Sequence, residues 1–185
     1  MSFYAQASAS FPSAKCMDER RGSGASHLRD EVSMRSLKSL ACQSETLRRI
    51  RRLSSRSPRR WGKMTANQMV CHLSDSYQMA LGDRPAKDRS SPLTRTWVKW
   101  KFLYSPFPWP QGVQTSPRND SLRDGTRPAV FREDLERLTR VFEGFVQAAA
   151  AGRCKRHPRF GFLTADEWLR WGYRHADHHL RQFRM

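Results

Sequence analysis

Three of the six histidines in this chain, His175, His178 and His179, fall within one short stretch near its C-terminus. If this stretch is helical, His175 and His179 are four residues apart and their imidazoles lie on one face, one turn apart. Two such imidazoles can share a metal ion, and a third ligand from another helix would complete an open transition-metal site. His178 lies about 100° around the axis from His179. The spacing therefore prefers His175 with His179, although it also permits His175 with His178.

A fourth histidine, His72, lies at the margin of the apolar set Met69, Leu73 and Tyr77. A lone histidine is more often an ordinary core or surface residue than a ligand. An imidazole that points inward at this position needs a buried partner, however, and a metal ion is one such partner. Asp75 could then accept a hydrogen bond that fixes the tautomer of an imidazole, or could itself be a fourth ligand. The histidine pair near the C-terminus favours the ligand interpretation of His72.

The histidines near the C-terminus belong to a longer stripe. Residues of this stripe follow one another at intervals of three or four and therefore share one helix face: Trp168, Trp171, His175, His179 and Gln182. We expect this face to point into the core of the domain. Trp171 and Gln182 are accordingly candidates to line a pocket beside the histidines or to contact them.

Four amphipathic helices must position these side chains, and we expect them over residues 34–53, 65–81, 128–152 and 164–185. Their apolar residues recur in steps of three and four. The second and fourth open with capping boxes, Thr65-Ala-Asn-Gln68 and Thr164-Ala-Asp-Glu167. No convincing strand accompanies them. The sequence therefore predicts an all-α fold, a four-helix bundle with a long crossover between its second and third helices.

The crossover, residues 83–127, is rich in aromatic residues. Residues 91–104 could form a short helix, whereas the three prolines of Ser105-Pro-Phe-Pro-Trp-Pro110 exclude a continuing one. We expect the aromatic side chains to cover the core, with the mouth of a pocket as the alternative. They are Trp97, Trp100, Phe102, Phe107 and Trp109.

Residues 1–33 show no apolar periodicity and are expected to form a disordered extension, which leaves residues 34–185 as one domain. The four cysteines include no Cys-x-x-Cys pair, which favours reduced thiols in a cytoplasmic protein. No apolar run approaches the roughly 18 to 20 residues that cross a bilayer, and no secretory signal is evident. The expected partners are a small-molecule substrate and, as an option, a second copy in a homodimer.

The net charge of +17 is spread along the chain rather than concentrated on one element. One cluster of arginines within residues 48–60 could contact phosphate or an anionic membrane surface. The interpretation we prefer is that this cluster is the solvated face of the first helix, with its arginines pointing outward.

Several separated motifs resemble those of a known superfamily. A histidine on the second helix and the His-x-x-His-His-x-x-Gln run of residues 175–182 are similar to the DinB-like superfamily, which includes the YfiT group of metal-dependent enzymes. More narrowly, the segments Trp61-Gly-Lys-Met-Thr-Ala-Asn-Gln-Met-Val-Cys-His72-Leu, Pro108-Trp-Pro and His157-Pro-Arg-Phe-Gly161 resemble an uncharacterised bacterial branch of that superfamily. The resemblance spans about residues 34–185.

The resemblance implies a DinB-like bundle that runs up-down-down-up. It also implies that His72, His175 and His179 bind a divalent metal ion, chiefly zinc or nickel, and leaves His178 outside the ligand set. Superfamily members include enzymes that use a low-molecular-weight thiol. Three neutral imidazoles leave coordination positions open for water or substrate. We therefore expect a metal-dependent hydrolase or a low-molecular-weight-thiol transferase.

The sequence does not identify a general base, for which Asp75 and Gln182 are the best polar candidates near the ligands. Cys71 adjoins His72, but neighbours on a helix diverge by about 100°, so we expect a buried structural cysteine rather than a nucleophile. Two other functions stay open. The metal ion could merely brace the second and fourth helices without catalysis, and the arginines of residues 48–60 could bind nucleic acid, which is the least favoured of the three.

Overall fold

A computed structural model of the chain describes residues 35–112 and 124–185. These residues form the helices α2 (Leu40–Arg51), α3 (Ala66–Leu81), a π-helical turn η1 (Thr94–Val98), α4 (Lys99–Tyr104), α5 (Phe131–Ala150) and α6 (Ala165–Gln182). The described residues include no strand, only an isolated bridge between His157 and Gly161. The prediction of an all-α protein is thereby confirmed. The expected disordered extension, residues 1–33, lies outside the described residues, as does part of the crossover.

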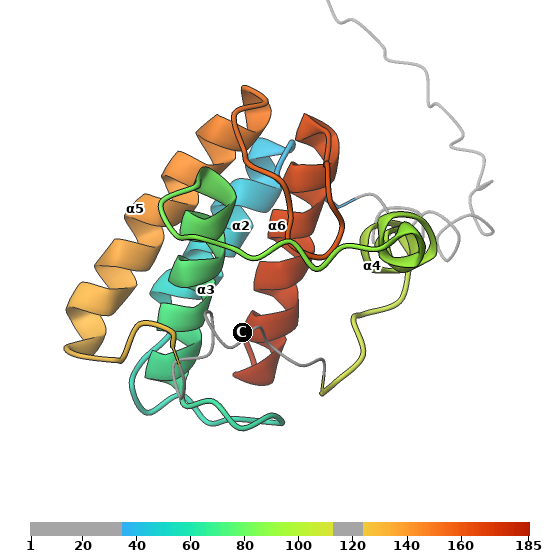
Figure 1. The fold of residues 1–185 in the computed structure, drawn as a ribbon. Coiled ribbons are helices and arrows are strands. Elements are labelled where there is room, and N and C mark those ends of the chain that lie inside the picture. The colour runs from blue at the N-terminus through green and yellow to red at the C-terminus, as the bar shows by residue number, and fades with distance from the viewer. Residues whose placement is uncertain (1–34, 113–123) are drawn as a thin grey trace, which may run out of the picture.

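The four long helices α2, α3, α5 and α6 pack against one another, and α4 lies beside α6 on the outer side (Figure 1). Backbone hydrogen bonds between segments show which ends meet: Leu37 N to Leu169 O (3.2 Å), Arg60 N to Gln182 O (2.7 Å) and Lys155 N to Ala80 O (2.8 Å). Helix α2 therefore begins where α6 begins, α3 begins where α6 ends, and α5 ends where α3 ends. Accordingly, α2 and α6 run in one direction, and α3 and α5 in the other.

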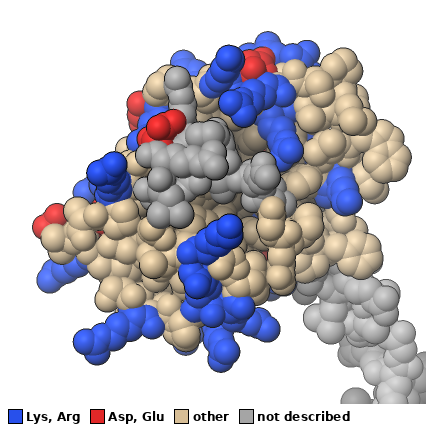
Figure 2. All heavy atoms as spheres, turned by 60° about the horizontal axis from the view of Figure 1, so that its bottom comes forward, with Lys and Arg blue, Asp and Glu red and all other residues tan. Residues whose placement is uncertain are grey.

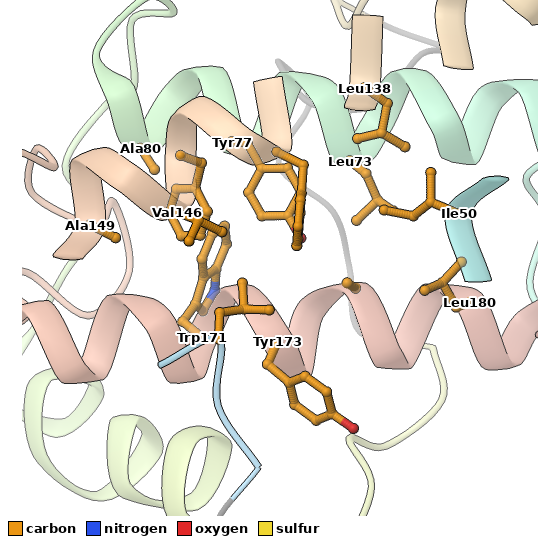
Figure 3. Close-up of a cluster of buried hydrophobic side chains, with 14 of the residues drawn as sticks. Ile50, Leu73, Tyr77, Ala80, Leu138, Val146, Ala149, Trp171, Tyr173 and Leu180 are labelled. Atoms are coloured by element: carbon orange, nitrogen blue, oxygen red, sulfur yellow. The ribbon is translucent and has the colours of Figure 1, made fainter. Parts of the chain in front are cut away.

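The centre of the core is the side chain of Tyr77 on α3, which is fully buried. Figure 3 shows Tyr77 among apolar side chains of the surrounding helices. Its ring stacks on Phe145 at 4.7 Å between centroids, and its hydroxyl donates a hydrogen bond to the carbonyl of Gly172 on α6. A Cβ at Gly172 would lie 2.4 Å from Cε1 of Phe145, so glycine is what permits α5 and α6 to approach here.

The two helices that carry the histidines begin where their capping boxes predict. Thr65 and Gln68 exchange both capping hydrogen bonds at the start of α3, and Thr164 and Glu167 do the same for α6. Helix α3 ends at Gly82, whose φ of 93° is the left-handed conformation that glycine adopts freely. Both helices are therefore fixed by local chemistry as well as by packing.

The first helix begins at Leu40 rather than near residue 34, so that expectation was too early. The reason is that Leu37 is bonded elsewhere. Its backbone N–H donates to Leu169 of α6, its carbonyl accepts from the side chain of Gln43, and its own side chain is fully buried. A turn held in this way anchors the chain to α6 before α2 starts.

The crossover aromatics divide into two groups instead of all covering the core. Phe102 and Trp109 pack against it, whereas Trp97, Trp100 and Phe107 are 70%, 57% and 73% exposed. The short helix formed by η1 and α4 rests on the domain through buried Leu103 and through an ion pair between Lys99 and Glu167 of α6. Its outer face therefore leaves the two tryptophans in solvent.

The arginine cluster of residues 48–60 is not a uniform solvated face. Arg49 is buried, and its guanidinium donates to Asp177 of α6 at 2.8 Å and to the carbonyl of Met185 at 2.9 Å. The expectation that the arginines of the first helix all point outward was therefore wrong for Arg49, because α6 supplies a carboxylate directly beneath it. Arg48, Arg51 and Arg52 are exposed as expected.

The surface seen from below the helices carries blue Lys and Arg side chains on all sides and few acidic ones (Figure 2). No helix within the described ranges combines the length and the apolar character that crossing a membrane requires. Cys42, Cys71 and Cys154 are free thiols, as expected, and Cys16 lies outside the described residues.

Candidate metal centre

Three buried imidazoles from two helices meet at one point, and we call them the histidine cluster: His72 of α3 and His175 and His179 of α6. Nε2 of His175 lies 3.2 Å from Nε2 of His72 and 3.1 Å from Nε2 of His179. Ligand nitrogens of the three residues all lie within 4.8 Å of one another. The side chains are at most 8% exposed. The structure thus brings together the three residues that the resemblance implies as ligands.

The histidine cluster cannot satisfy its own hydrogen bonds with neutral rings. Nδ1 of His179 lies 3.0 Å from Oε1 of Gln182, an acceptor, so the ring proton is on Nδ1 and Nε2 carries a lone pair. His175 has one ring proton. If this proton is on Nε2 and points at Nε2 of His179, then Nε2 of His175 cannot also accept a hydrogen bond from His72. If instead His72 donates to Nε2 of His175, then the contact between His175 and His179 joins two lone pairs. At most one of the two short contacts can be an N–H···N bond.

A proton does not resolve this conflict near neutral pH. Burial first, and then the neighbouring imidazoles, hold the pKa of His175 well below its usual 6.5. Burial first, and then the neighbouring imidazoles of His72 and His178, do the same to the pKa of His179. Both rings are therefore neutral near pH 7, which is the protonation state of a metal ligand. Converging lone pairs without protons fit a metal cation.

Aromatic rings enclose His175 on two sides. Trp109 stacks on it with centroids 5.7 Å apart, and Trp171 lies at 4.8 Å. The indole N–H of Trp109 donates to the carbonyl of Phe102 at 2.7 Å, which fixes the ring in place. Trp171 and Gln182 thus both contact the histidine cluster, as their positions on the α6 stripe indicate.

His178 lies beside the cluster but outside it. Its ring is 5.1 Å from that of His179 and lies between Trp61 and Trp109, at 6.4 Å and 5.9 Å. Burial lowers its pKa. Its nitrogens are not among the ligand atoms that converge at the histidine cluster. The structure therefore favours the pairing of His175 with His179 over the alternative pairing of His175 with His178.

Asp75 turns away from the imidazoles. Its two carboxylate oxygens accept hydrogen bonds from the backbone N–H and the hydroxyl of Thr126, at 2.8 Å and 2.7 Å, and form an ion pair with Arg84 at 3.1 Å. These contacts join α3 to the segment before α5. The structure therefore gives Asp75 a role in holding the crossover, and Asp75 is not part of the group of residues whose ligand atoms converge at the histidine cluster.

Cys71 also faces away from the histidine cluster. Its sulfur is fully buried and lies 3.5 Å from Nη2 of Arg137 on α5, and burial raises the pKa of its thiol to about 12. A protonated, inaccessible thiol is not a nucleophile. This agrees with the expectation of a buried structural cysteine.

Residues 32–185 match a protein family described as "Protein of unknown function (DUF1569)". The chain belongs to this family. The match includes all three residues of the histidine cluster and both helices that carry them. Comparison of the DUF1569 chain with curated proteins and with solved structures gave no match.

One residue that shapes the site of this DUF1569 protein was missed by sequence reasoning. Arg174 of α6 donates from Nη1 to the carbonyl of Ser105 and from Nη2 to that of Phe107, both at 2.7 Å. It thereby fastens the proline-rich segment to α6 and brings Trp109 over His175. Nothing in the sequence around Arg174 distinguishes it from the other arginines of this helix.

Proposed function

We propose that this DUF1569 protein is a metal-dependent enzyme, in which His72, His175 and His179 bind one divalent transition-metal ion. Zinc and nickel are the expected metals. The observation that carries the proposal is the pair of short Nε2 contacts at His175, of which neutral rings can satisfy only one. A cation at the point where the lone pairs converge removes that conflict, and burial of neutral imidazoles suits it.

The proposed fold is a DinB-like four-helix bundle made by α2, α3, α5 and α6. The meeting ends of these helices support an up-down-down-up order, since α2 and α6 run one way and α3 and α5 the other. The positions of the ligands on α3 and α6 support the same assignment. Helix α4 and the segment that follows it then belong to the crossover.

The proposed reaction is that of a hydrolase or of a low-molecular-weight-thiol transferase. An ion held by His72, His175 and His179 would supply Lewis-acid chemistry, which would lower the pKa of a water or thiol bound there. The acidic residues on the same two helices do not offer a free base, because all of them form ion pairs: Asp75 with Arg84, Asp166 with Lys38, Glu167 with Lys99, and Asp177 with Arg49 and Arg181. A carboxylate of these two helices is therefore not available as a general base.

The chain's own residues have defined tasks in this scheme. Gln182 holds the proton of His179 on Nδ1, which leaves Nε2 to coordinate. Trp109 and Trp171 enclose His175 and exclude water from that side of the site. Arg174 positions Trp109 through the carbonyls of the preceding segment.

Metal stoichiometry tests the site. Protein purified without an affinity tag and stripped of metal should bind one equivalent of Co²⁺ or Zn²⁺ by elemental analysis, and His175→Ala should bind none. His178→Ala is the matched control, because it removes a buried imidazole of the same helix that does not converge with the others. Full occupancy in His175→Ala would overturn the proposal.

A second measurement separates an enzyme from a bundle that the ion only braces. If coordination positions are open, azide or a small thiol should change the visible spectrum of the Co²⁺ protein. A spectrum that neither ligand changes would favour the bracing role. Ester hydrolysis and thiol-transfer assays on the Zn²⁺ and Ni²⁺ forms then distinguish the two proposed reactions.

A further inference from the structure

A cavity of about 340 Å³ lies beside the histidine cluster, between the C-terminal half of α6, the segment after α4 and residues 60–61. Figure 1 shows that segment descending from α4 along the lower part of α6. Trp109 and His178 line the cavity, and the ring of Trp109 also stacks on His175 while that of His178 lies beside His179. These two side chains therefore connect the cavity with the histidine cluster. We call the cavity the arginine cavity.

Most of the described lining side chains are aromatic or charged, and two prolines, Gln111 and His178 complete the lining. Four are aromatic: Trp61, Phe107, Trp109 and Tyr173. The charged ones are four arginines, Arg35, Arg60, Arg174 and Arg181, and a single acid, Asp177. A volume of about 340 Å³ lies within the range of small-molecule sites. The excess of arginine gives it a positive potential.

Among the described lining residues, the one acid is already neutralised. Asp177 accepts from Arg49 and from Arg181, each at 2.8 Å. Arg35 has its own partners, Glu45 at 3.2 Å and the hydroxyl of Tyr173 at 3.0 Å. Positive charge in the lining therefore exceeds the charge that these acids can balance.

The remaining two arginines, Arg60 and Arg174, form no ion pair with a carboxylate in the part of the chain that the structure describes. Arg60 lies over the ring of Trp61, with its guanidinium carbon 5.8 Å from the centroid. Arg174 is bonded to two carbonyls, and its buried Nε has no partner among the described residues. An anion beside these two guanidinium groups would supply the charged partner that they lack among the described residues.

We infer that the arginine cavity binds an organic anion, a carboxylate carried on a flat aromatic body. The guanidinium groups of Arg60 and Arg174 match the charge of the carboxylate, and the four aromatic walls match the apolar surface of the ring. Assigning this anion as the substrate class rests on the proposed function, since the cavity adjoins the proposed metal ligands through Trp109 and His178. Binding of the anion itself needs no metal.

Calorimetric titration of the full, metal-free chain tests this inference with 1-naphthoate as the probe. One equivalent should bind, and the neutral 1-naphthalenemethanol should bind about tenfold more weakly or worse, because it lacks the charge. Arg60→Gln should weaken naphthoate binding about fivefold. Arg48→Gln, which removes an exposed arginine outside the cavity, should leave it unchanged.

Three results would overturn the inference. The first is equal affinity for 1-naphthoate and the neutral 1-naphthalenemethanol, and the second is equal affinity of Arg60→Gln and Arg48→Gln for naphthoate. The third is displacement of naphthoate by inorganic phosphate at matched concentration, which would show that the ring is not recognised. The outcome is independent of the proposed function. Naphthoate binding without Co²⁺ binding contradicts the metal site alone, and Co²⁺ binding without naphthoate binding contradicts the cavity alone.

Discussion

His72 and His175 face each other across the interface of α3 and α6, with their Nε2 atoms 3.2 Å apart. Their separation along the chain is 103 residues, so only the packing of the two helices sets this distance. The contact of His175 with His179, in contrast, is set within one turn of α6. The pair of His175 and His179 is therefore formed as soon as α6 forms, whereas His72 joins this pair only when the domain has folded.

We expect Gln182→Ala to weaken Zn²⁺ binding by about 10- to 100-fold, because the acceptor that holds the proton of His179 on Nδ1 is lost. Gln182→Glu keeps an acceptor at that position and should retain affinity. Competition with a chromophoric chelator measures both. Equal affinity in Gln182→Ala and the parent protein would contradict a role for this hydrogen bond.

Acid should destabilise the metal-free protein from about pH 6.5 downward. The pKa of buried His157 is lowered to about 3, and the pKa values of His175 and His179 are also lowered by burial. Below pH 6.5 the unfolded chain therefore binds protons that the folded chain does not. Each such histidine reduces the free energy of unfolding by about 1.4 kcal/mol per pH unit. Urea titrations between pH 8 and pH 5 measure the slope.

His157→Asn provides the control for this pH dependence. Nδ1 of His157 accepts from the backbone N–H groups of Arg159 and Phe160, and an asparagine oxygen can replace that acceptor without titrating. The slope should then decrease by about 1.4 kcal/mol per pH unit. A stability that is the same at pH 7 and pH 5 in the parent protein would show that these histidines do not stay neutral.

Gly172→Ala should reduce the free energy of unfolding by about 1 to 3 kcal/mol. The new Cβ would lie 2.4 Å from Cε1 of Phe145 and 3.0 Å from Cδ1 of Leu37, so α6 would have to move away from its neighbours. Gly144→Ala on α5 is the matched control, since no atom lies within 4 Å of its Cβ position. It should stabilise the protein by up to about 1 kcal/mol. Similar effects at both positions would contradict close packing at Gly172.

Arg49→Met should destabilise the fold by about 2 kcal/mol, since it removes a buried charge that binds Asp177 and the carbonyl of Met185. Arg48→Met, one residue earlier and exposed, should change stability by less than about 0.5 kcal/mol. Chemical denaturation of both variants measures the difference. If the two substitutions have the same effect, the ion pair between α2 and α6 does not contribute.

The features that sequence predicted are those set by neighbouring residues. The capping boxes at Thr65 and Thr164 and the four-residue spacing of His175 and His179 depend on hydrogen bonds and geometry within one helix. They were confirmed as local structure, and they suffice to place two imidazoles together. His72 came from its apolar neighbours and from the resemblance, because spacing along the chain does not relate α3 to α6.

The features that sequence did not predict depend on contacts between distant segments. Asp75 pairs with Arg84 and Thr126, which its place three residues after His72 could not indicate. Burial of Arg49 depends on an aspartate of α6, and the position of Trp109 depends on Arg174. In each case, a charged side chain finds a partner on another element, and composition and periodicity carry no information about that partner.

Because the histidine cluster is divided between α3 and α6, the proposed metal affinity would also depend on the core. Figure 3 shows Leu73 of α3 beside Ile50 and Leu180 of α6 below it, on the same two helices as the histidine cluster. If an ion binds all three imidazoles, it binds only when α3 and α6 are packed together. Its binding free energy would therefore stabilise this helix pair against separation. Truncation of Leu180, which weakens this packing, would then raise the dissociation constant for the metal, although none of the three histidines had been changed.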